Sequence, residues 1–279
     1  MEKLAAQSLS LSYGATTIID HLDLHIPQGK ISILIGSNGC GKSTLLRSFA
    51  RLLKPEQGTI LLNGRSISQM STKEVAKQMA VLPQGPVLPE ALTVLQLVRL
   101  GRYPHQRLFQ QWSEEDECQV TKALRMTHLE SLQERAVDSL SGGQRQRAWI
   151  AMTLAQNTEV LLLDEPTTYL DMAHQVEILD LLFDLNQEEQ RTIVMVLHDL
   201  NLACRYAHHI IAVHDKGVHS QGLPEEVVTK KMIRDVFGME CEIGTDLLFG
   251  TPVCIPHGKG RKIIPRQEFK GKQELRKVY

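Results

Sequence analysis

The stretch "KISILIGSNGCGKSTLLRSFARLL", from Lys30 to Leu53, reads as a short buried strand, a glycine-rich loop and a helix. Residues 36–43 match the pattern G-x-x-x-x-G-K-[ST], whose glycines let backbone N–H groups face phosphate oxygens. Lys42 would reach the β- and γ-phosphates, and the Ser43 hydroxyl would bind Mg²⁺. A chance glycine turn is the alternative, and the flanking strand and helix argue against it. The predicted phosphate-binding residues are Gly36, Ser37, Asn38, Gly39, Cys40, Gly41, Lys42, Ser43 and Thr44.

Two carboxylates follow a second buried strand, in "EVLLLDEP" from Glu159 to Pro166. Asp164 is expected to face Mg²⁺, and Glu165 beside it is expected to act as the general base for the attacking water. Taken alone, such a pair is more often a charge at a helix N-terminus. Because the same chain carries the phosphate-binding loop, the two motifs together predict a nucleoside triphosphatase.

Three more residues are candidates for the same site. His198 ends the buried strand "RTIVMVLHDL", where an imidazole could hydrogen-bond the γ-phosphate and the attacking water. Gln84, in "VLPQGP", could touch Mg²⁺ or the water, and Tyr13 offers a flat ring for an adenine base. Each also has an ordinary interpretation, as a structural histidine, a loop amide and a strand tyrosine.

Buried strands alternate with helices, which predicts an α/β fold with a mostly parallel core sheet and ligands at the strand ends. The first 26 residues alternate apolar and polar positions, as an antiparallel β-subdomain does. Helical periodicity from about residue 86 to 157 predicts an inserted α-helical subdomain. We expect one nucleotide-binding domain over residues 1–258 and a basic, solvated tail over 259–279. One amphipathic helix, "MAHQVEILDLLFDLNQ", is expected to bury Val176, Leu179, Leu182 and Phe183 on one stripe.

Composition restricts the partners and the compartment. The chain has 279 residues, a formal net charge of −1 and 42% hydrophobic residues, so its overall charge gives no reason to expect nucleic acid. Its five cysteines are scattered and form no C-x-x-C pair, which argues against disulfides or zinc and favours a reducing cytoplasm. No signal-peptide pattern and no run of about 18 apolar residues occurs. The sequence therefore predicts a soluble chain that can still dock on a membrane protein.

A second glycine turn occurs in "LSGGQRQRAWI", from Leu140 to Ile150. Its serine can cap the following helix, its glycines allow close backbone approach, and the helix start favours negative charge. If this turn does not meet the phosphate-binding loop within one chain, two copies placed head to tail complete each other's sites. We therefore predict a homodimer with two shared ATP sites. The residues of this turn are Leu140, Ser141, Gly142, Gly143 and Gln144.

The motifs "GSNGCGKST", "VLPQ", "LSGGQ", "LLLDEPTTYLD" and "VLHD", in this order, resemble the ATP-binding subunit of an ATP-binding-cassette (ABC) transporter. The resemblance covers about the first 240 residues and implies a P-loop ATPase that uses ATP and Mg²⁺. It implies that Tyr13 stacks on adenine and that Gln84 is the Q-loop glutamine, a Mg²⁺ ligand beside Ser43 and Asp164. It also makes Glu165 the catalytic base, His198 the switch histidine and Asp171 the D-loop aspartate.

Further stretches resemble the ATPases of iron(III)-siderophore importers, namely "LGRYPH", "SGGQRQRAWIAM", "TYLDMAHQVEILDLL" and "FGTPVCIPHG". This resemblance implies a homodimer under two membrane permease subunits, supplied by a substrate-binding protein, at the cytoplasmic face of the cell membrane. Residues 85–105 would carry the groove that contacts the permease. Tyr169 departs from the small residue that commonly precedes Leu-Asp in the D-loop of this family.

The motifs leave other functions open. The same ATPase could serve haem, cobalamin or a divalent metal, because the cargo never touches this chain. A soluble ABC protein acting on DNA repair or ribosomes usually carries a long coiled-coil insertion or a second cassette, and neither occurs in this sequence. A metabolite kinase is disfavoured by the LSGGQ turn.

Overall fold

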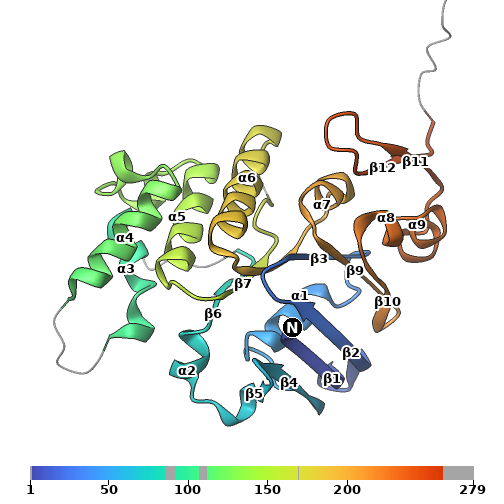
Figure 1. Ribbon diagram of the computed structural model, residues 1–279, viewed down its shortest axis with the longest axis horizontal. Helices are drawn as coiled ribbons and strands as arrows, with labels where there is room; N and C mark the ends of the chain where they lie inside the picture. Colours follow the sequence, from blue (N-terminus) through green and yellow to red (C-terminus); the bar gives the residue numbers. More distant parts are fainter. Residues whose placement is uncertain (1, 86–91, 107–111, 169, 260–279) are drawn as a thin grey trace, which may run out of the picture.

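The computed structural model describes residues 2–85, 92–106, 112–168 and 170–259, and the statements below refer to these ranges. Its centre is a six-stranded sheet of β3 (Ile31–Ile35), β6 (Met79–Leu82), β7 (Val160–Asp164), β8 (Thr192–Val196), β9 (His209–His214) and β10 (Gly217–Gly222). The strand order is β10-β9-β3-β8-β7-β6. In Figure 1, β6 and β7 lie to the left of β3, and β9 and β10 lie to its right. β9, β3, β8, β7 and β6 pair in parallel, and β10 pairs antiparallel with β9. The predicted mostly parallel core sheet is confirmed.

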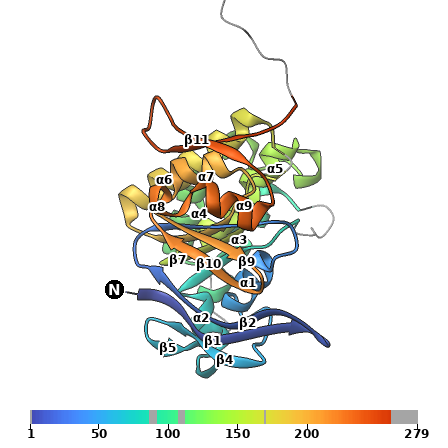
Figure 2. The same ribbon diagram turned by 90° about the vertical axis from the view of Figure 1, so that its right-hand side faces the viewer.

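A second sheet comes from the N-terminal part of the chain, with strands β1 (Glu2–Tyr13), β2 (Thr16–Pro27), β4 (Gln57–Leu62) and β5 (Arg65–Ser66). It is antiparallel, in the order β2-β1-β4-β5, and lies below the core sheet in Figure 2. β1 and β2 form a hairpin whose turn contains Gly14 at φ +59°. This is the antiparallel N-terminal subdomain that the alternating pattern predicts.

The helices between the strands are α1 (Lys42–Phe49), α2 (Thr72–Ala76), α3 (Val94–Leu100), α4 (Glu114–Met126), α5 (Gly142–Ala155), α6 (Met172–Glu189), α7 (Leu200–Tyr206), α8 (Pro224–Val227) and α9 (Lys230–Phe237). The chain then forms a hairpin of β11 (Cys241–Thr245) and β12 (Pro252–Pro256). α3, α4 and α5 follow one another between β6 and β7, within the segment expected to be helical. The division into a domain over 1–258 and a subdomain at 86–157 stays a prediction, and residues 86–91 and the tail beyond 259 lie outside the described residues.

Two apolar clusters cover the two faces of the core sheet. Because side chains alternate along a strand, Ile33 of β3 enters one cluster and Leu34 enters the other. The first cluster also contains buried residues of α3 to α7, and the second joins α1 to the N-terminal sheet. Packing on both faces fixes the ends of the parallel strands, where polar side chains gather.

The buried stripe of α6 differs from the expected one. Leu179 and Leu182 are buried as predicted, but Ile178 and Leu185 complete the stripe instead of Val176 and Phe183. Phe183 lies at the edge of the core, where its ring meets the Tyr206 ring edge-on at 6.2 Å.

The structure also shows the state of the cysteines and the lengths of the apolar helices. All five cysteines lie in described ranges and are free thiols. Within the described ranges, no helix has the length and apolar character needed to cross a bilayer.

Candidate functional site

Four parallel strands bring the predicted catalytic residues to one edge of the core sheet. Gly36 and Glu165 directly follow β3 and β7, while Gln84 and His198 come two residues after β6 and β8. Parallel strands end at the same edge, so these residues meet there. Gln84, Glu165 and His198 border a pocket of about 390 Å³, within the range typical of small-molecule sites. Its lining residues are Ile18, Asn38, Gly39, Gly41, Lys42, Ser43, Thr44, Gln84, Glu165 and His198.

The glycine-rich loop requires glycine where it enters and where it leaves. Gly36 has φ +149°, and a Cβ there would lie 2.4 Å from the Val213 carbonyl oxygen. Gly41 has φ +108°, directly before α1, and a Cβ there would lie 3.0 Å from Ile18 Cγ2. The loop therefore curls tightly, with the hairpin of the N-terminal sheet against it.

The loop also surrounds the Lys42 ammonium group. This side chain is buried, and its Nζ donates to the carbonyl oxygens of Gly36 and Ser37, each at 2.9 Å. A fixed positive charge thus lies at the N-terminus of α1, where the helix dipole also favours anions. The arrangement suits a polyphosphate chain.

Ser43 and Asp164 form a pair of oxygen donors beside the loop. Ser43 Oγ donates to Asp164 Oδ1 at 2.8 Å, and Asp164 is 2% exposed. Burial raises the pKa of Asp164 above its ordinary value, although the hydrogen bond from Ser43 opposes this shift. A buried carboxylate that needs positive charge nearby, next to a hydroxyl, has the donor chemistry that Mg²⁺ prefers.

Glu165 is the most constrained side chain of the pocket. One oxygen, Oε1, lies 2.7 Å from His198 Nε2, and the carboxylate is 10% exposed. The other, Oε2, accepts hydrogen bonds from Gln84 Nε2 and Thr168 Oγ1, both at 2.8 Å. The backbone of Glu165 is left-handed, at φ +54°, which costs an L-residue about 1–2 kcal/mol. Sequence patterns missed Thr168, which reaches Glu165 because the loop after β7 turns back on itself.

These contacts determine the charge of Glu165. Burial would raise its pKa, but hydrogen bonds from Thr168, His198 and Gln84 outweigh that effect and hold the pKa below its ordinary value. The carboxylate is therefore ionised at neutral pH. An ionised carboxylate has about four acceptor positions, and with three in use it can still accept a proton from water.

The other predicted residues do not line this pocket. Tyr13 ends β1, is 46% exposed and pairs with Thr16, two residues before the pocket residue Ile18. Asp171 is the N-cap of α6, where its Oδ1 accepts from the His174 amide. The second glycine turn begins α5, separate from the pocket-lining residues.

The second turn forms a capping box. The Gln144 amide donates to Ser141 Oγ at 3.3 Å, and the Ser141 amide donates to Gln144 Oε1 at 3.1 Å. Ser141 and Gly142 are exposed, while Leu140 and Gly143 are buried. The prediction that Ser141 caps the following helix is confirmed, and Ser141 and Gly142 are exposed at the start of α5.

Comparison with known proteins gives consistent matches. A family model described as ABC transporter matches residues 19–168. The chain is 63% identical over 269 residues to the "Probable siderophore transport system ATP-binding protein YusV" of Bacillus subtilis, covering 96% of this chain and 98% of that protein. It is 67% identical over 260 residues to the petrobactin import ATP-binding protein FpuD of Bacillus anthracis, covering 93% and 95% respectively.

Solved structures resemble most of the fold. One is an inward-facing metal-chelate type ABC transporter, with a TM-score of 0.80 and 29% identity over 93% of this chain and 99% of that one. Another is the dimeric ATP-binding cassette MJ0796 bound to ADP and phosphate, with a TM-score of 0.69 and 29% identity over 79% and 98%.

Proposed function

The chain belongs to the ABC transporter family, and on that premise we propose that it hydrolyses ATP to drive import of an iron(III)-siderophore complex through a membrane permease. One observation carries the catalytic part of this proposal. Glu165 is ionised and held by His198, Gln84 and Thr168 at the edge of the same pocket that contains the Lys42 ammonium. A base for water and a phosphate-binding cation thus share one pocket.

The residues then divide the reaction between them. Lys42 and the loop amides bind the β- and γ-phosphates, and Glu165 accepts the proton of the attacking water. His198 orients the Glu165 carboxylate and contacts the γ-phosphate. Ser43 and Asp164, with Gln84, would hold Mg²⁺, which when bound neutralises charge on the phosphates. Tyr13 would stack on the adenine.

The outward-facing glycine turn supports a head-to-tail homodimer. It begins α5 with exposed Ser141 and Gly142, and it does not line the pocket of its own chain. In the dimer, residues 140–144 of one chain would donate to the γ-phosphate held by the other, with Asp171 beside them. This homodimer would lie under two permease subunits at the cytoplasmic face of the membrane, and a substrate-binding protein would deliver the cargo.

Replacing Glu165 with Gln tests the catalytic assignment and the dimer together. The amide keeps the shape of the side chain but cannot accept a proton, so we expect ATP binding to persist and turnover to fall at least about 100-fold, the lower end for a lost general base. ATP should then trap a dimer, measured by light scattering.

The exposed residue Glu130 provides the control, since it pairs with Arg125 on the surface and lies outside the pocket. Glu130→Gln should keep wild-type turnover. A Glu165→Gln chain that binds ATP and stays monomeric would contradict the shared-site dimer.

The cargo is tested in cells. A deletion strain, complemented with the wild-type or the Glu165→Gln chain, should be supplied with ferric siderophores, haem, cobalamin or free metal ions. We expect loss of growth on at least one ferric siderophore, restored by the wild-type chain alone. Normal uptake of every iron source, with a defect for haem, cobalamin or a metal ion, would assign the other cargo instead.

A further inference from the structure

Gly143, in the second glycine turn, is buried beneath the ring of His174 from the first turn of α6. A Cβ at Gly143 would lie 3.0 Å from His174 Cδ2 and 3.2 Å from Cγ. Both distances are shorter than ordinary van der Waals contact, so the ring occupies the space that a side chain would need. Two segments that are 31 positions apart in the chain are thus packed face to face.

The His174 ring is also hydrogen-bonded to Asp171. His174 Nδ1 lies 2.7 Å from Asp171 Oδ1, and the same oxygen accepts from the His174 backbone amide at 3.0 Å. These two hydrogen bonds from His174 lower the pKa of Asp171, so the carboxylate stays ionised and keeps accepting. The imidazole therefore has one edge on Asp171 and its carbon face on Gly143.

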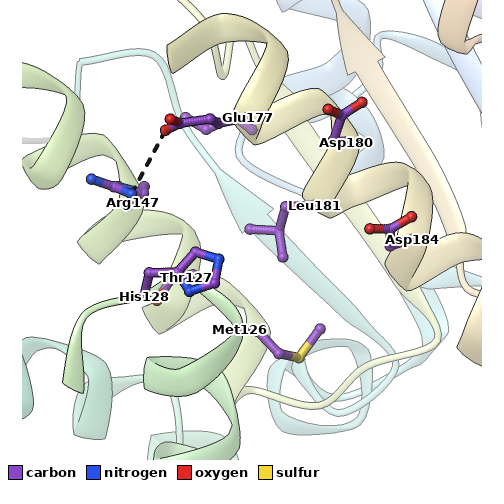
Figure 3. Close-up of a pocket in the computed structure, with 9 residues that line it drawn as sticks. Met126, Thr127, His128, Arg147, Glu177, Asp180, Leu181 and Asp184 are labelled. Atoms are coloured by element: carbon purple, nitrogen blue, oxygen red, sulfur yellow. Dashed lines mark ion pairs between the residues drawn. The ribbon is translucent and has the colours of Figure 1, made fainter. Parts of the chain in front are cut away.

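Nearby contacts show where α5 and α6 are joined. Gln146 Nε2 donates to the Pro166 carbonyl oxygen at 2.8 Å, again linking the start of α5 to the loop before α6. Farther along, the helices border a cavity of about 430 Å³ that also reaches His128, and Arg147 and Glu177 approach each other at its rim at 3.7 Å (Figure 3). A partly exposed pair at that distance contributes little, at most about 1 kcal/mol. The contacts at the beginning of the two helices therefore hold the second turn in place.

We propose that His174 is a positioning residue that locks the second glycine turn and Asp171 into one rigid unit. This rests on the proposed head-to-tail dimer, in which both segments enter the partner's ATP site. The turn offers backbone N–H groups, whose effect depends on direction, and a misplacement of about 1 Å can cost 100-fold in a catalytic arrangement. His174 acts through the turn and touches no phosphate itself.

The test starts from the Glu165→Gln chain, in which ATP drives dimer formation without turnover. Adding His174→Ala should raise the ATP concentration for half-maximal dimerisation at least about tenfold, equal to about 1.4 kcal/mol. ATP binding to the isolated chain should stay unchanged, because the phosphate-binding loop is intact. His21→Ala is the matched control, since His21 also pairs with a carboxylate, at 2.7 Å from Asp20, on an exposed surface.

Mixed dimers separate a positioning role from a general folding defect. Two differently labelled Glu165→Gln chains are mixed, and one of them also carries Lys42→Ala. The single remaining ATP site then consists of the phosphate-binding loop of the chain with intact Lys42 and the second glycine turn of the Lys42→Ala chain. His174→Ala should weaken this dimer only when it sits on the Lys42→Ala chain. The two arrangements contain identical substitutions, so an equal effect in both overturns the proposal.

A second measurement checks the contact without ATP. Alanine is favoured over glycine in a helix by about 1 kcal/mol, but at position 143 its Cβ meets the His174 ring. Gly143→Ala should therefore lower Tm in the wild-type chain and raise it in the His174→Ala chain. A Tm change of the same sign in both backgrounds would overturn the inference, and so would a His174→Ala chain that dimerises as before. Failure of the Glu165→Gln chain alone to dimerise would instead overturn the head-to-tail dimer.

Discussion

Thr168 helps to keep Glu165, the proposed catalytic base, in its charged form. Its hydroxyl bond to Glu165 is the first of the contacts that lower the pKa of that carboxyl, against burial, from an ordinary value of 4.5. A base with a lowered pKa keeps its proton-accepting form as the pH falls, and loses it only below its ordinary range. Thr168→Val removes the bond at constant size, so the acid limb of the ATPase pH profile should move to higher pH.

The control for this pH profile is a threonine that makes no contact with Glu165. Thr59, whose hydroxyl bonds Ser66 in the N-terminal sheet, serves this purpose, and Thr59→Val should leave the acid limb where it is. An unmoved acid limb in Thr168→Val would show that burial, His198 and Gln84 determine the ionisation of Glu165 without Thr168.

Single residues differ in how well the sequence predicts them. Glu165 and His198 could be proposed because each lies at or soon after an apolar run that reads as the end of a buried strand, whereas Gln84 could be proposed only from the motif "VLPQ". Thr168 and His174 could not, because their contacts depend on how the loop after β7 folds back and how α6 is rotated. The helical period of 3.6 residues predicts that α6 exists, but it does not fix the rotation of the helix to within one residue. Ile178, rather than the expected Phe183, is therefore buried.

The helices α3, α4 and α5 are joined by a buried ion pair. Arg102, from the quoted segment "LGRYPH", is 1% exposed, and its Nε donates to Asp116 Oδ1 at 2.8 Å. Its Nη1 also donates to the Ala155 carbonyl oxygen at the end of α5. Arg102→Met leaves the buried Asp116 carboxylate without its positively charged partner, which should lower the free energy of unfolding by about 3–5 kcal/mol. Urea denaturation measures this loss.

An exposed pair on the same helices is the matched comparison. Arg99 lies 3.1 Å from Glu117, with both side chains more than 40% exposed. Arg99→Met should cost less than about 1 kcal/mol because water screens the pair. Equal losses for the two variants would mean that burial does not determine the strength of the Arg102 pair.

Elements were predicted where the apolar pattern is long or bounded by glycine. β3, β7 and β8 stand out as runs of buried residues, and the β1–β2 hairpin as alternation around Gly14. The four-residue β6 was missed because so short a run has no period of its own. The order of strands in the core sheet is set by packing between distant segments, which no local pattern records.

The order of the core strands also governs how the protein is made. β3 lies between β8 and β9, and its neighbours follow it in the chain by about 160 residues or more. At a translation rate of about 5–20 residues per second, β3 leaves the ribosome roughly 10–30 s before either neighbour exists. During that interval, both edges of an apolar strand are unpaired and open to aggregation or chaperone capture. The pace of synthesis through the middle of the chain therefore sets how long each newly made molecule is at risk.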